Sequence, residues 1–472
     1  MPRPTHSPTS LLLLGVLSAF GAMASCRLTE SLDDFTSGEP RIFGAGGSGL
    51  PDSGLDGAAG DAQVQDSAHD SSGTAGGSGS DGGAGASGTG GSSGSAGSSG
   101  SGGLDGGSDA NGSDASQPAC SLGSCSGACS SCDGNSANGC ETDTDSNSSH
   151  CGVCGHSCQG APCVGGSCQP VSLATGLNTP WGIVADESNA YWTEEGSGSV
   201  PSGSLSSVPV KGGSSKTLLV GQYAPLFIAA DDTYLFWANF ANGGSINRVK
   251  KSDGTAFKKL TDANSPAGIA LASDSVVYSS GTSIWKIPKD GGSAQVLATQ
   301  TGMNPKGVAI DSTGVYWADV GLSAIMFKPS SGAAKSLVGQ QKYPLSVVVD
   351  DIYVYWANAG TFVSGECSTS DGSIMRANKD GSNPITIATA QACPQGLLLA
   401  GTRLYWTNLG TKHASYDLNG AIMTATVLGG SIKSLATGQS KPWGIAANKT
   451  FLFWTNQGVF SGEGSAQRVP LL

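Results

Sequence analysis

Seven polar residues recur at one position of a repeated aromatic segment. Each follows a run such as Tyr-Trp-Thr or Tyr-Trp-Ala, and we call them the polar ring: Glu194, Asn239, Ser280, Asp319, Asn358, Asn408 and Asn456. Carboxylate and amide oxygens suit hard cations, so such a ring could hold a ligand, Ca²⁺ or another divalent ion. The same side chains also satisfy backbone N–H groups at strand ends. Because the position recurs in every copy, we favour the structural interpretation and predict no cofactor.

Two tryptophans are less uniform. Trp181 and Trp443 each follow a proline that opens a repeat, in the first and the last copy. They could form an aromatic patch that stacks a sugar or a peptide, or they could simply pack in the interior.

The repeats define the elements that carry these residues. Each begins with a proline and an apolar segment, such as "PWGIVAD" or "PKGVAID", and continues with an aromatic segment, an alternating segment, a Gly turn and a short fourth segment. The anchor prolines are Pro180, Pro225, Pro266, Pro305, Pro344, Pro394 and Pro442. Segments of this length, rich in Val, Ile and aromatics and bounded by Gly, Asp or Pro, predict strands. The spacing matches one four-stranded propeller blade per repeat.

The aromatic segments resemble those of YWTD-type and NHL-like propellers. Tryptophan occupies the motif position in six of the seven repeats, at Trp192, Trp237, Trp317, Trp356, Trp406 and Trp454, and the third repeat has Tyr278 instead. The resemblance covers residues 180–472 and implies an all-β propeller in which these residues pack blade against blade. YWTD domains usually have six blades, whereas the anchors here predict seven, with six as the alternative.

Loops after the aromatic strands vary most, and they should share one face with the loops that enter each blade. Binding residues concentrate on such loops. Cys367 and Cys393 belong to loops of this face in neighbouring blades, so we predict a disulfide between them. "SLATG" occurs at residues 434–438 and again at residues 172–176, before the first anchor. We expect the earlier copy to supply the missing fourth strand of the last blade and close the ring.

Residues 118–170 form a separate cysteine-rich module with ten cysteines. A segment this short and poor in apolar residues needs disulfides to hold its shape. The stretch "GCETDTDSNSSHCGVCGHSC" resembles a module of secreted myxobacterial proteins. Zinc binding by Cys151, Cys154, His156 and Cys158 is an alternative. Asp143, Asp145 and Asn147 begin like a calcium loop, but Ser148 and Cys154 replace its required Gly and Glu, which leaves only a non-EF-hand calcium site open.

The N-terminal region predicts export and anchoring. Residues 1–25 combine Arg3 with a short apolar run, as in a signal peptide. Met23-Ala24-Ser25-Cys26 resembles a bacterial lipobox, which implies lipidation of Cys26; an ordinary cleaved signal is the alternative. Arg27, rather than Asp, suggests sorting to the outer membrane. Residues 26–117 are mostly Gly, Ser, Ala and Asp and predict a flexible linker to the lipid bilayer.

Charge and missing motifs narrow the function of residues 171–472. Of the 24 Lys and Arg and 36 Asp and Glu of the chain, residues 1–170 hold 3 and 17, so the propeller is nearly neutral and nucleic acid is excluded as a partner. His413, with Asp417 nearby, is the single histidine after residue 171, and no nucleophile elbow, phosphate loop or paired-histidine motif occurs. We therefore expect an outer-membrane or cell-surface lipoprotein whose propeller binds a protein, peptide or glycan. The alternative is a metal-dependent hydrolase or lyase at the channel mouth.

Overall fold

The structure is a computed structural model of the 472-residue chain. It describes residues 127–133, 135, 140–196, 200–240, 243–363, 366–367, 369–411 and 419–472. These residues form strands, turns and loops, and among them no helix has the length and apolarity needed to cross a bilayer. The signal peptide, Cys26 and the linker of the sequence predictions lie outside the described residues.

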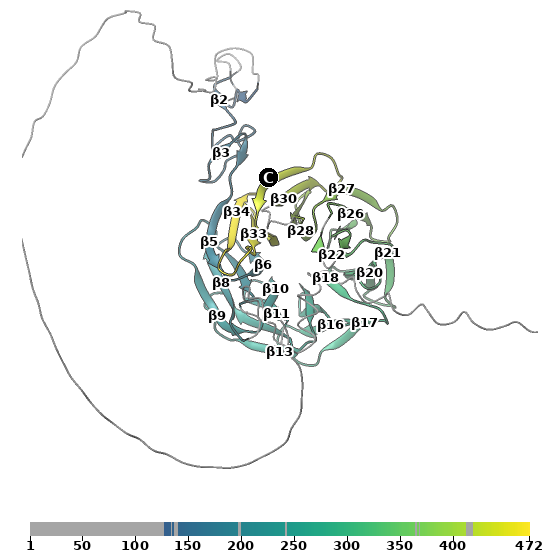
Figure 1. Cartoon of the computed structure of the whole chain (residues 1–472). Helices are drawn as coiled ribbons and strands as arrows, with labels where there is room; N and C mark the ends of the chain where they lie inside the picture. Colours follow the sequence, from purple (N-terminus) through teal and green to yellow (C-terminus); the bar gives the residue numbers. More distant parts are fainter. Residues whose placement is uncertain are drawn as a thin grey trace, which may run out of the picture. The chain divides into compact units, whose positions relative to one another are not determined.

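The described strands form seven four-stranded antiparallel sheets, the blades of a propeller. The blades surround a central axis, as Figure 1 shows. Blade 1 consists of β6 (Pro180–Ala185), β7 (Asn189–Glu194), β8 (Gly203–Pro209) and β9 (Lys216–Gln222). Blade 2 consists of β10 (Pro225–Ala230), β11 (Tyr234–Asn239), β12 (Ser245–Lys250) and β13 (Lys258–Asp262). Blade 3 consists of β14 (Pro266–Leu271), β15 (Ser275–Ser280), β16 (Ser283–Pro288) and β17 (Gln295–Thr299). Blades 4 and 5 are β18 (Pro305–Ile310), β19 (Gly314–Asp319), β20 (Ala324–Pro329) and β21 (Lys335–Val338); β22 (Pro344–Val349), β23 (Tyr353–Asn358), β26 (Gly372–Asn378) and β27 (Ile385–Gln391). Blades 6 and 7 are β28 (Pro394–Ala400), β29 (Arg403–Asn408), β30 (Gly420–Thr426) and β31 (Lys433–Gln439); β32 (Pro442–Ala447), β33 (Phe451–Asn456), β34 (Gly464–Pro470) and β5 (Val171–Leu177). The prediction of an all-β, seven-bladed propeller is confirmed, and the six-bladed alternative is wrong.

Three further strand pairs are short. β24 (Phe362–Val363) and β25 (Glu366–Cys367) form a hairpin in the loop between the second and third strands of blade 5. In the cysteine-rich module, β1 (Cys129–Ser130) pairs with β2 (Thr142–Asp143), and β3 (Cys163–Val164) pairs with β4 (Ser167–Cys168).

The second strand of each blade is buried on both sides, which explains its almost continuous apolar sequence. All six tryptophans of the aromatic segments are no more than 1% exposed, and Tyr278 of blade 3 is equally buried. Tyr355 and Ile374 of blade 5, for example, share a core cluster with Leu404 and Trp406 of blade 6. The core is therefore a series of apolar layers between neighbouring blades.

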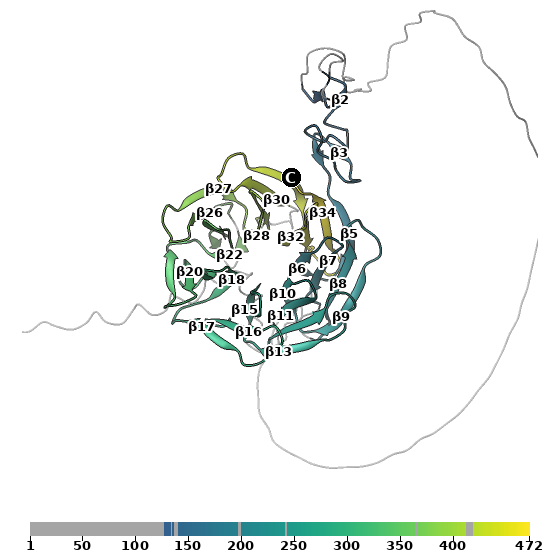
Figure 2. The ribbon, with the colours of Figure 1, turned by 180° about the vertical axis from the view of Figure 1, so that it is seen from behind.

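The ring closes through the strand that precedes the first anchor. β5 pairs with β34, with Ala174 opposite Ala466 and Leu177 opposite Gly464, and the two strands lie side by side in the front and back views (Figures 1 and 2). The Thr455 hydroxyl of blade 7 donates to the backbone oxygen of Trp181 in blade 1 at 2.5 Å. The predicted ring closure is confirmed, and it joins segments more than 280 residues apart in the chain.

Five of the seven anchor prolines, those of blades 1, 2, 3, 6 and 7, pack against a glycine of the preceding blade. A Cβ atom on Gly464, which opens β34, would lie 2.4 Å from Cδ of Pro180. Gly203 and Gly420 stand in the same relation to Pro225 and Pro442. Any larger residue at these glycines would push two blades apart, so the Pro–Gly pairs set the spacing between blades.

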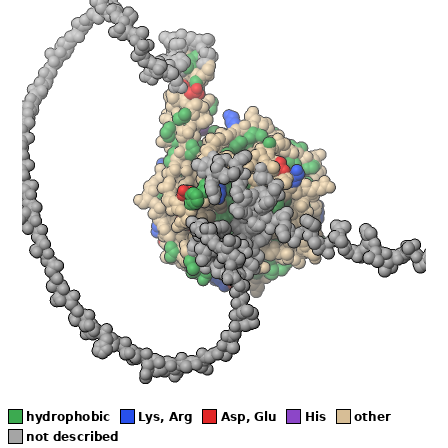
Figure 3. Space-filling model, in the orientation of Figure 1, with side chains coloured by type: hydrophobic (Ala, Val, Ile, Leu, Met, Phe, Trp, Pro, Cys, Tyr) green, Lys and Arg blue, Asp and Glu red, His purple; other side chains and the backbone are tan. Residues whose placement is uncertain are grey.

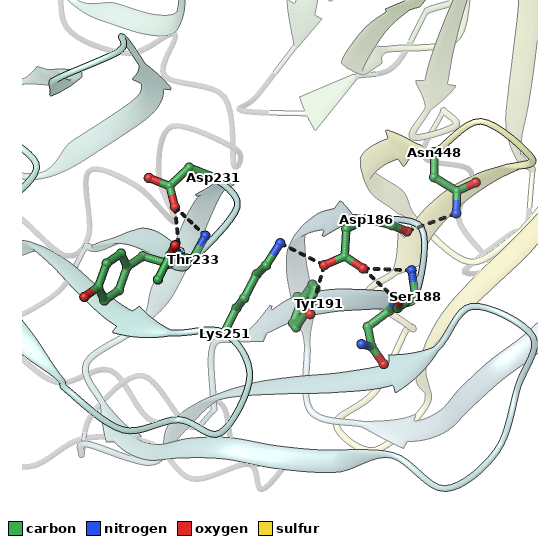
Figure 4. Close-up of polar contacts among 9 residues, drawn as sticks. Asp186, Ser188, Tyr191, Asp231, Thr233, Lys251 and Asn448 are labelled. Atoms are coloured by element: carbon green, nitrogen blue, oxygen red, sulfur yellow. Dashed lines mark hydrogen bonds and ion pairs between the residues drawn. The ribbon is translucent and has the colours of Figure 1, made fainter.

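Ion pairs join blades on the face formed by the short turns. Asp186 accepts hydrogen bonds from Ser188 N and Asn189 N in its own turn and pairs with Lys251 of blade 2 at 2.9 Å (Figure 4). Burial opposes ionisation, but Lys251 and the two N–H donors hold the pKa of Asp186 below its usual range. The same pairing links Asp231 to Lys289 and Asp311 to Lys379. These lysines and aspartates therefore stabilise the propeller itself, and we call the residues that hold the blades together the frame.

Candidate functional site

The polar ring ends the second strands of the seven blades. In three blades the tryptophan two residues earlier donates directly to the ring residue. Trp192 Nε1 donates to Glu194 at 3.2 Å, Trp237 Nε1 to Asn239 at 3.0 Å and Trp317 Nε1 to Asp319 at 3.1 Å. These ring residues therefore satisfy buried indole groups.

Blades 5, 6 and 7 use a glutamine that sequence reasoning missed. In blade 6, Gln391 Oε1 accepts a hydrogen bond from Trp406 Nε1 and another from Asn408 Nδ2, both at 2.9 Å. Gln341 and Gln439 play the same part in blades 5 and 7. Each glutamine stands three residues before an anchor proline, at the end of the preceding blade. The recurrent glutamine is visible in the sequence, but the tryptophan and asparagine that it binds belong to the following repeat.

The presence of this glutamine differs between blades and follows the type of ring residue and the presence of the tryptophan. Blade 2 retains one, Gln222, which accepts from Asn239 Nδ2. The positions three residues before Pro180 and Pro305 hold Leu177 and Gly302, and there the ring residue is an acid that accepts from the indole itself. Blade 3 has no tryptophan at the motif position and no such glutamine. Ring residue, indole and glutamine thus vary together, as expected of a structural hydrogen-bond network.

This network leaves little ligand capacity for a metal ion. The Oδ1 atoms of Asn358, Asn408 and Asn456 are buried without a protein partner, and a water molecule is the ordinary partner of such an acceptor. The three oxygens belong to three different blades, one oxygen to each, whereas a divalent cation needs several oxygens that converge on one point. Among the described residues, groups of three or more His, Cys, Asp or Glu side chains close enough to share an ion occur only in the cysteine-rich module.

A second ring of residues differs in chemical type from blade to blade. The residues that directly follow the anchor prolines begin the first strands, which surround the channel, and we call them the mouth residues: Trp181, Leu226, Ala267, Lys306, Leu345, Gln395 and Trp443. A cavity of about 220 Å³ runs between these first strands, and its walls are mostly Gly, Ile, Leu and Val. The mouth is therefore asymmetric around a largely apolar channel, which suits recognition of one ligand group in one orientation.

Trp181 and Trp443 meet where blade 7 adjoins blade 1. Their ring centroids lie 4.3 Å apart with an interplanar angle of 64°. Trp181 is 4% exposed and packs with Leu226 and Phe240, whereas Trp443 is half-buried and lines the channel. The structure thus brings together the two tryptophans of the predicted aromatic patch, and Trp443 is the one that faces the cavity.

Glu195 lies against this pair and was not singled out from the sequence. Trp181 Nε1 donates to Glu195 Oε2 at 2.7 Å. Burial raises the pKa of Glu195 to about 7, although the hydrogen bond from Trp181 opposes the shift. The available signal was the doubled acid in "TEEG", which occurs in the first repeat alone.

The raised pKa of Glu195 predicts a stability that depends on pH. A carboxyl group with a folded-state pKa above its unfolded value stabilises the fold below pH 4.5, and this contribution is lost as pH rises through 7. We expect Glu195→Gln to match the parent near pH 4.5 and to exceed it by about 1–3 kcal/mol at pH 8. Urea unfolding at both pH values measures the difference, with the exposed Asp232→Asn as control. Equal differences at both pH values would contradict the assignment.

Cys367 and Cys393 are joined in a disulfide with their Cα atoms 5.9 Å apart. Cys393 precedes the anchor proline of blade 6, and both cysteines are buried with Ala359. The bond ties the variable loop of blade 5 to the entry of blade 6, so this loop is held at the face that carries the mouth.

Disulfides also engage the cysteines of the module. Cys132 pairs with Cys154, Cys151 with Cys163 and Cys158 with Cys168, and Cys129 and Cys140 are disulfide-bonded as well. The three cysteines of the zinc alternative therefore lie in three separate disulfides, and a disulfide sulfur is not the thiolate that zinc requires.

Two of the three candidate calcium residues, Asp143 and Asn147, use their side-chain oxygens within turns. Asp143 accepts from Asp145 N and from the Ser146 hydroxyl, and Asn147 accepts from Ser149 N. These are turn hydrogen bonds that side chains of this type commonly make with the backbone. His413 and Asp417 lie outside the described residues.

Fold and mouth together define a seven-bladed β-propeller with an asymmetric, aromatic channel entrance. No protein-family model matches the chain, and no curated protein matches its sequence. Among solved structures it is similar to virginiamycin B lyase from Staphylococcus aureus, an inactive variant crystallised with quinupristin: TM-score 0.50, 17% identity, over 64% of this chain and 99% of that one. It is also similar to the WD40 propeller of Doa1 (0.48, 12%, 64% and 95%) and to a chain of a nidogen/laminin complex (0.37, 22%, 44% and 79%). At 17% identity, the likeness to the lyase shows the fold alone.

Proposed function

We propose that this protein is a surface-tethered lipoprotein whose propeller binds a polypeptide at the channel mouth. The observation that carries the proposal is the contrast between two rings. The polar ring is largely bonded within the frame, whereas the mouth residues differ from blade to blade and surround an apolar cavity. A rigid frame with a variable, partly apolar entrance is the usual arrangement of a binding propeller.

The near-neutral charge balance of residues 171–472 supports a neutral rather than a highly charged partner. On the described part of the face in Figure 3, charged side chains are few and scattered. Large single-sign fields are what nucleic-acid partners require. A glycan stacked on the tryptophans is the competing outcome of the test below.

Partner capture tests the site. The mature chain, immobilised through its C-terminus, should retain a polypeptide from the envelope fraction of the producing cell, and Trp443→Ala should reduce capture at least roughly tenfold, as loss of a central aromatic anchor does. Phe257→Ala, at an aromatic residue that is 50% exposed on blade 2, serves as the matched control. Capture that survives Trp443→Ala, or that protease treatment of the fraction leaves intact while glycosidase abolishes it, would overturn the polypeptide assignment.

The lipid anchor is tested separately. Cys26→Ser should move the protein from the membrane pellet to the soluble fraction and abolish labelling by a fatty-acid analogue, because one thioether-linked lipid and its companion acyl chains provide the anchoring free energy. Unchanged membrane association would show that something else holds the chain there.

The alternative, a metal-dependent hydrolase or lyase at the mouth, has less support. Asp319 accepts hydrogen bonds from Asn304 N, Leu322 N and Trp317 Nε1, so its carboxylate is already used by the frame. Asp319→Ala with Asn358→Ala should therefore lower the melting temperature without changing the binding of Ca²⁺ or Zn²⁺ measured by calorimetry.

A further inference from the structure

Trp181, Trp443 and Glu195 converge on one side of the channel mouth, and the repeated frame does not require them. The backbone N–H of Glu195 donates to Thr179 O, and the other six blades make the same bond from Phe240, Gly281, Val320, Ala359, Leu409 and Gln457. An ionisable side chain occurs at this position in blade 1 alone. The adjacent blades 7 and 1 likewise are the two with tryptophan as mouth residue.

Within the described part of the chain, the carboxyl group of Glu195 has a hydrogen-bond donor but no ion-pair partner. Its side-chain partner among the described residues is the neutral indole of Trp181. The ion pairs found among the described residues all use aspartate as the acid. A partly buried carboxylate with one neutral donor is costly to ionise, and a cation brought by a ligand would offset that cost.

The half-buried indole of Trp443 supplies a second attraction for a cation, whereas Trp181, at 4% exposure, contributes through its contact with the Trp443 ring. Trp181 and Trp443 meet edge to face, and Trp443 lines the channel cavity. Indole faces attract organic cations through their quadrupole, most strongly where water is partly excluded. The cationic mouth residue, Lys306, belongs to blade 4, three blades along the ring from Glu195. The side of the mouth at blades 7 and 1 thus combines a carboxyl group with aromatic surface.

We infer that the Trp181–Trp443–Glu195 corner binds an organic cation, a primary or quaternary ammonium group, of the ligand that the propeller takes. The inference deepens the proposed function and rests on it: the polypeptide would present a lysine side chain or an amino terminus to this corner. Its apolar stem would enter the channel, whose 220 Å³ cavity has room for a group of that size.

A pair of isosteric probes tests the inference on the full chain, purified in a non-ionic detergent. Choline and its neutral isostere 3,3-dimethylbutan-1-ol are titrated at pH 8, where the carboxyl group is ionised, and followed by calorimetry and indole fluorescence. We expect choline to bind roughly tenfold more tightly than the isostere, with the difference lost in Glu195→Gln. Trp443→Leu should weaken choline binding by a similar factor. Glu463→Gln, which removes a carboxylate from a loop of the same face, should leave it within about twofold.

The outcomes separate this inference from the proposed function. Equal affinity for the two probes, no choline binding, or unchanged choline binding in Glu195→Gln would overturn the cation corner. If partner capture still depended on Trp443 in that case, the proposed function would stand with a different ligand group at the mouth. Circular dichroism melts of each variant show that loss of binding is not loss of folding.

Discussion

Deletion of residues 171–177 is expected to lower the unfolding free energy of the propeller by about 3–6 kcal/mol. β5 buries Leu173 and Leu177, which are 7% and 8% exposed, and each such side chain contributes about 1.5–3 kcal/mol. The deletion also leaves β34 as an unpaired edge, which favours aggregation. The loss is a large fraction of the stability of a typical domain. Urea unfolding followed by tryptophan fluorescence measures it, because the six motif tryptophans lie between blades.

A truncation that stops just before β5 provides the control. A chain that begins at residue 171 lacks the cysteine-rich module but keeps the closing strand, so its propeller should melt close to the parent. Leu173→Ala tests the same contact without truncation and should cost about 2–3 kcal/mol. An unchanged melt in both the 171–177 deletion and Leu173→Ala would show that β5 does not close the ring.

Replacing Gln391 by Leu is the second change with a large expected effect, about 2–4 kcal/mol. The substitution keeps the approximate volume but leaves Trp406 Nε1 and Asn408 Nδ2 without their acceptor, and a buried unsatisfied donor costs about 1–3 kcal/mol. Both partners are buried, at 0% and 6% exposure, so water cannot readily substitute for the lost acceptor. Thermal unfolding by calorimetry measures the effect.

A double-mutant cycle separates this effect from a loss of packing. Trp406→Phe removes one of the stranded donors, so its combination with Gln391→Leu should cost less than the sum of the single changes. Blade 3, which has neither the tryptophan nor the glutamine, is the natural precedent for that combination. Gln295→Leu, at an exposed position of β17, is the matched control and should change the unfolding free energy by less than about 0.5 kcal/mol. Strict additivity in the cycle would contradict the proposed network.

The repeats allowed most of the fold to be predicted because each blade is a local unit. Strand, turn and anchor proline follow one another within about 40 residues, so their pattern is visible without knowledge of distant contacts. Closure by residues 171–177 could also be predicted, because "SLATG" at residues 172–176 repeats the fourth strand at residues 434–438. These predictions needed only periodicity and the count of strands.

The candidate site could be predicted less well, because its residues are defined by contacts between repeats. Gln391 and Trp406 hydrogen-bond across a blade boundary, and nothing in the local pattern of either segment names the other. Glu195 follows a ring residue in the sequence and looked like one more loop acid. Its environment depends on Trp181, whose indole reaches it from the neighbouring strand.

The sequence by itself determined the number of blades, the four-strand plan of each and the two tryptophans at the seam, since all of these follow from short-range order repeated along the chain. The tertiary structure decided which polar residues belong to the frame and which remain for a ligand. The polar ring looked like a ligand site in the sequence, but its members mostly satisfy indole and amide groups buried between blades. The mouth residues looked like ordinary strand positions, and ring formation alone brings them around one channel.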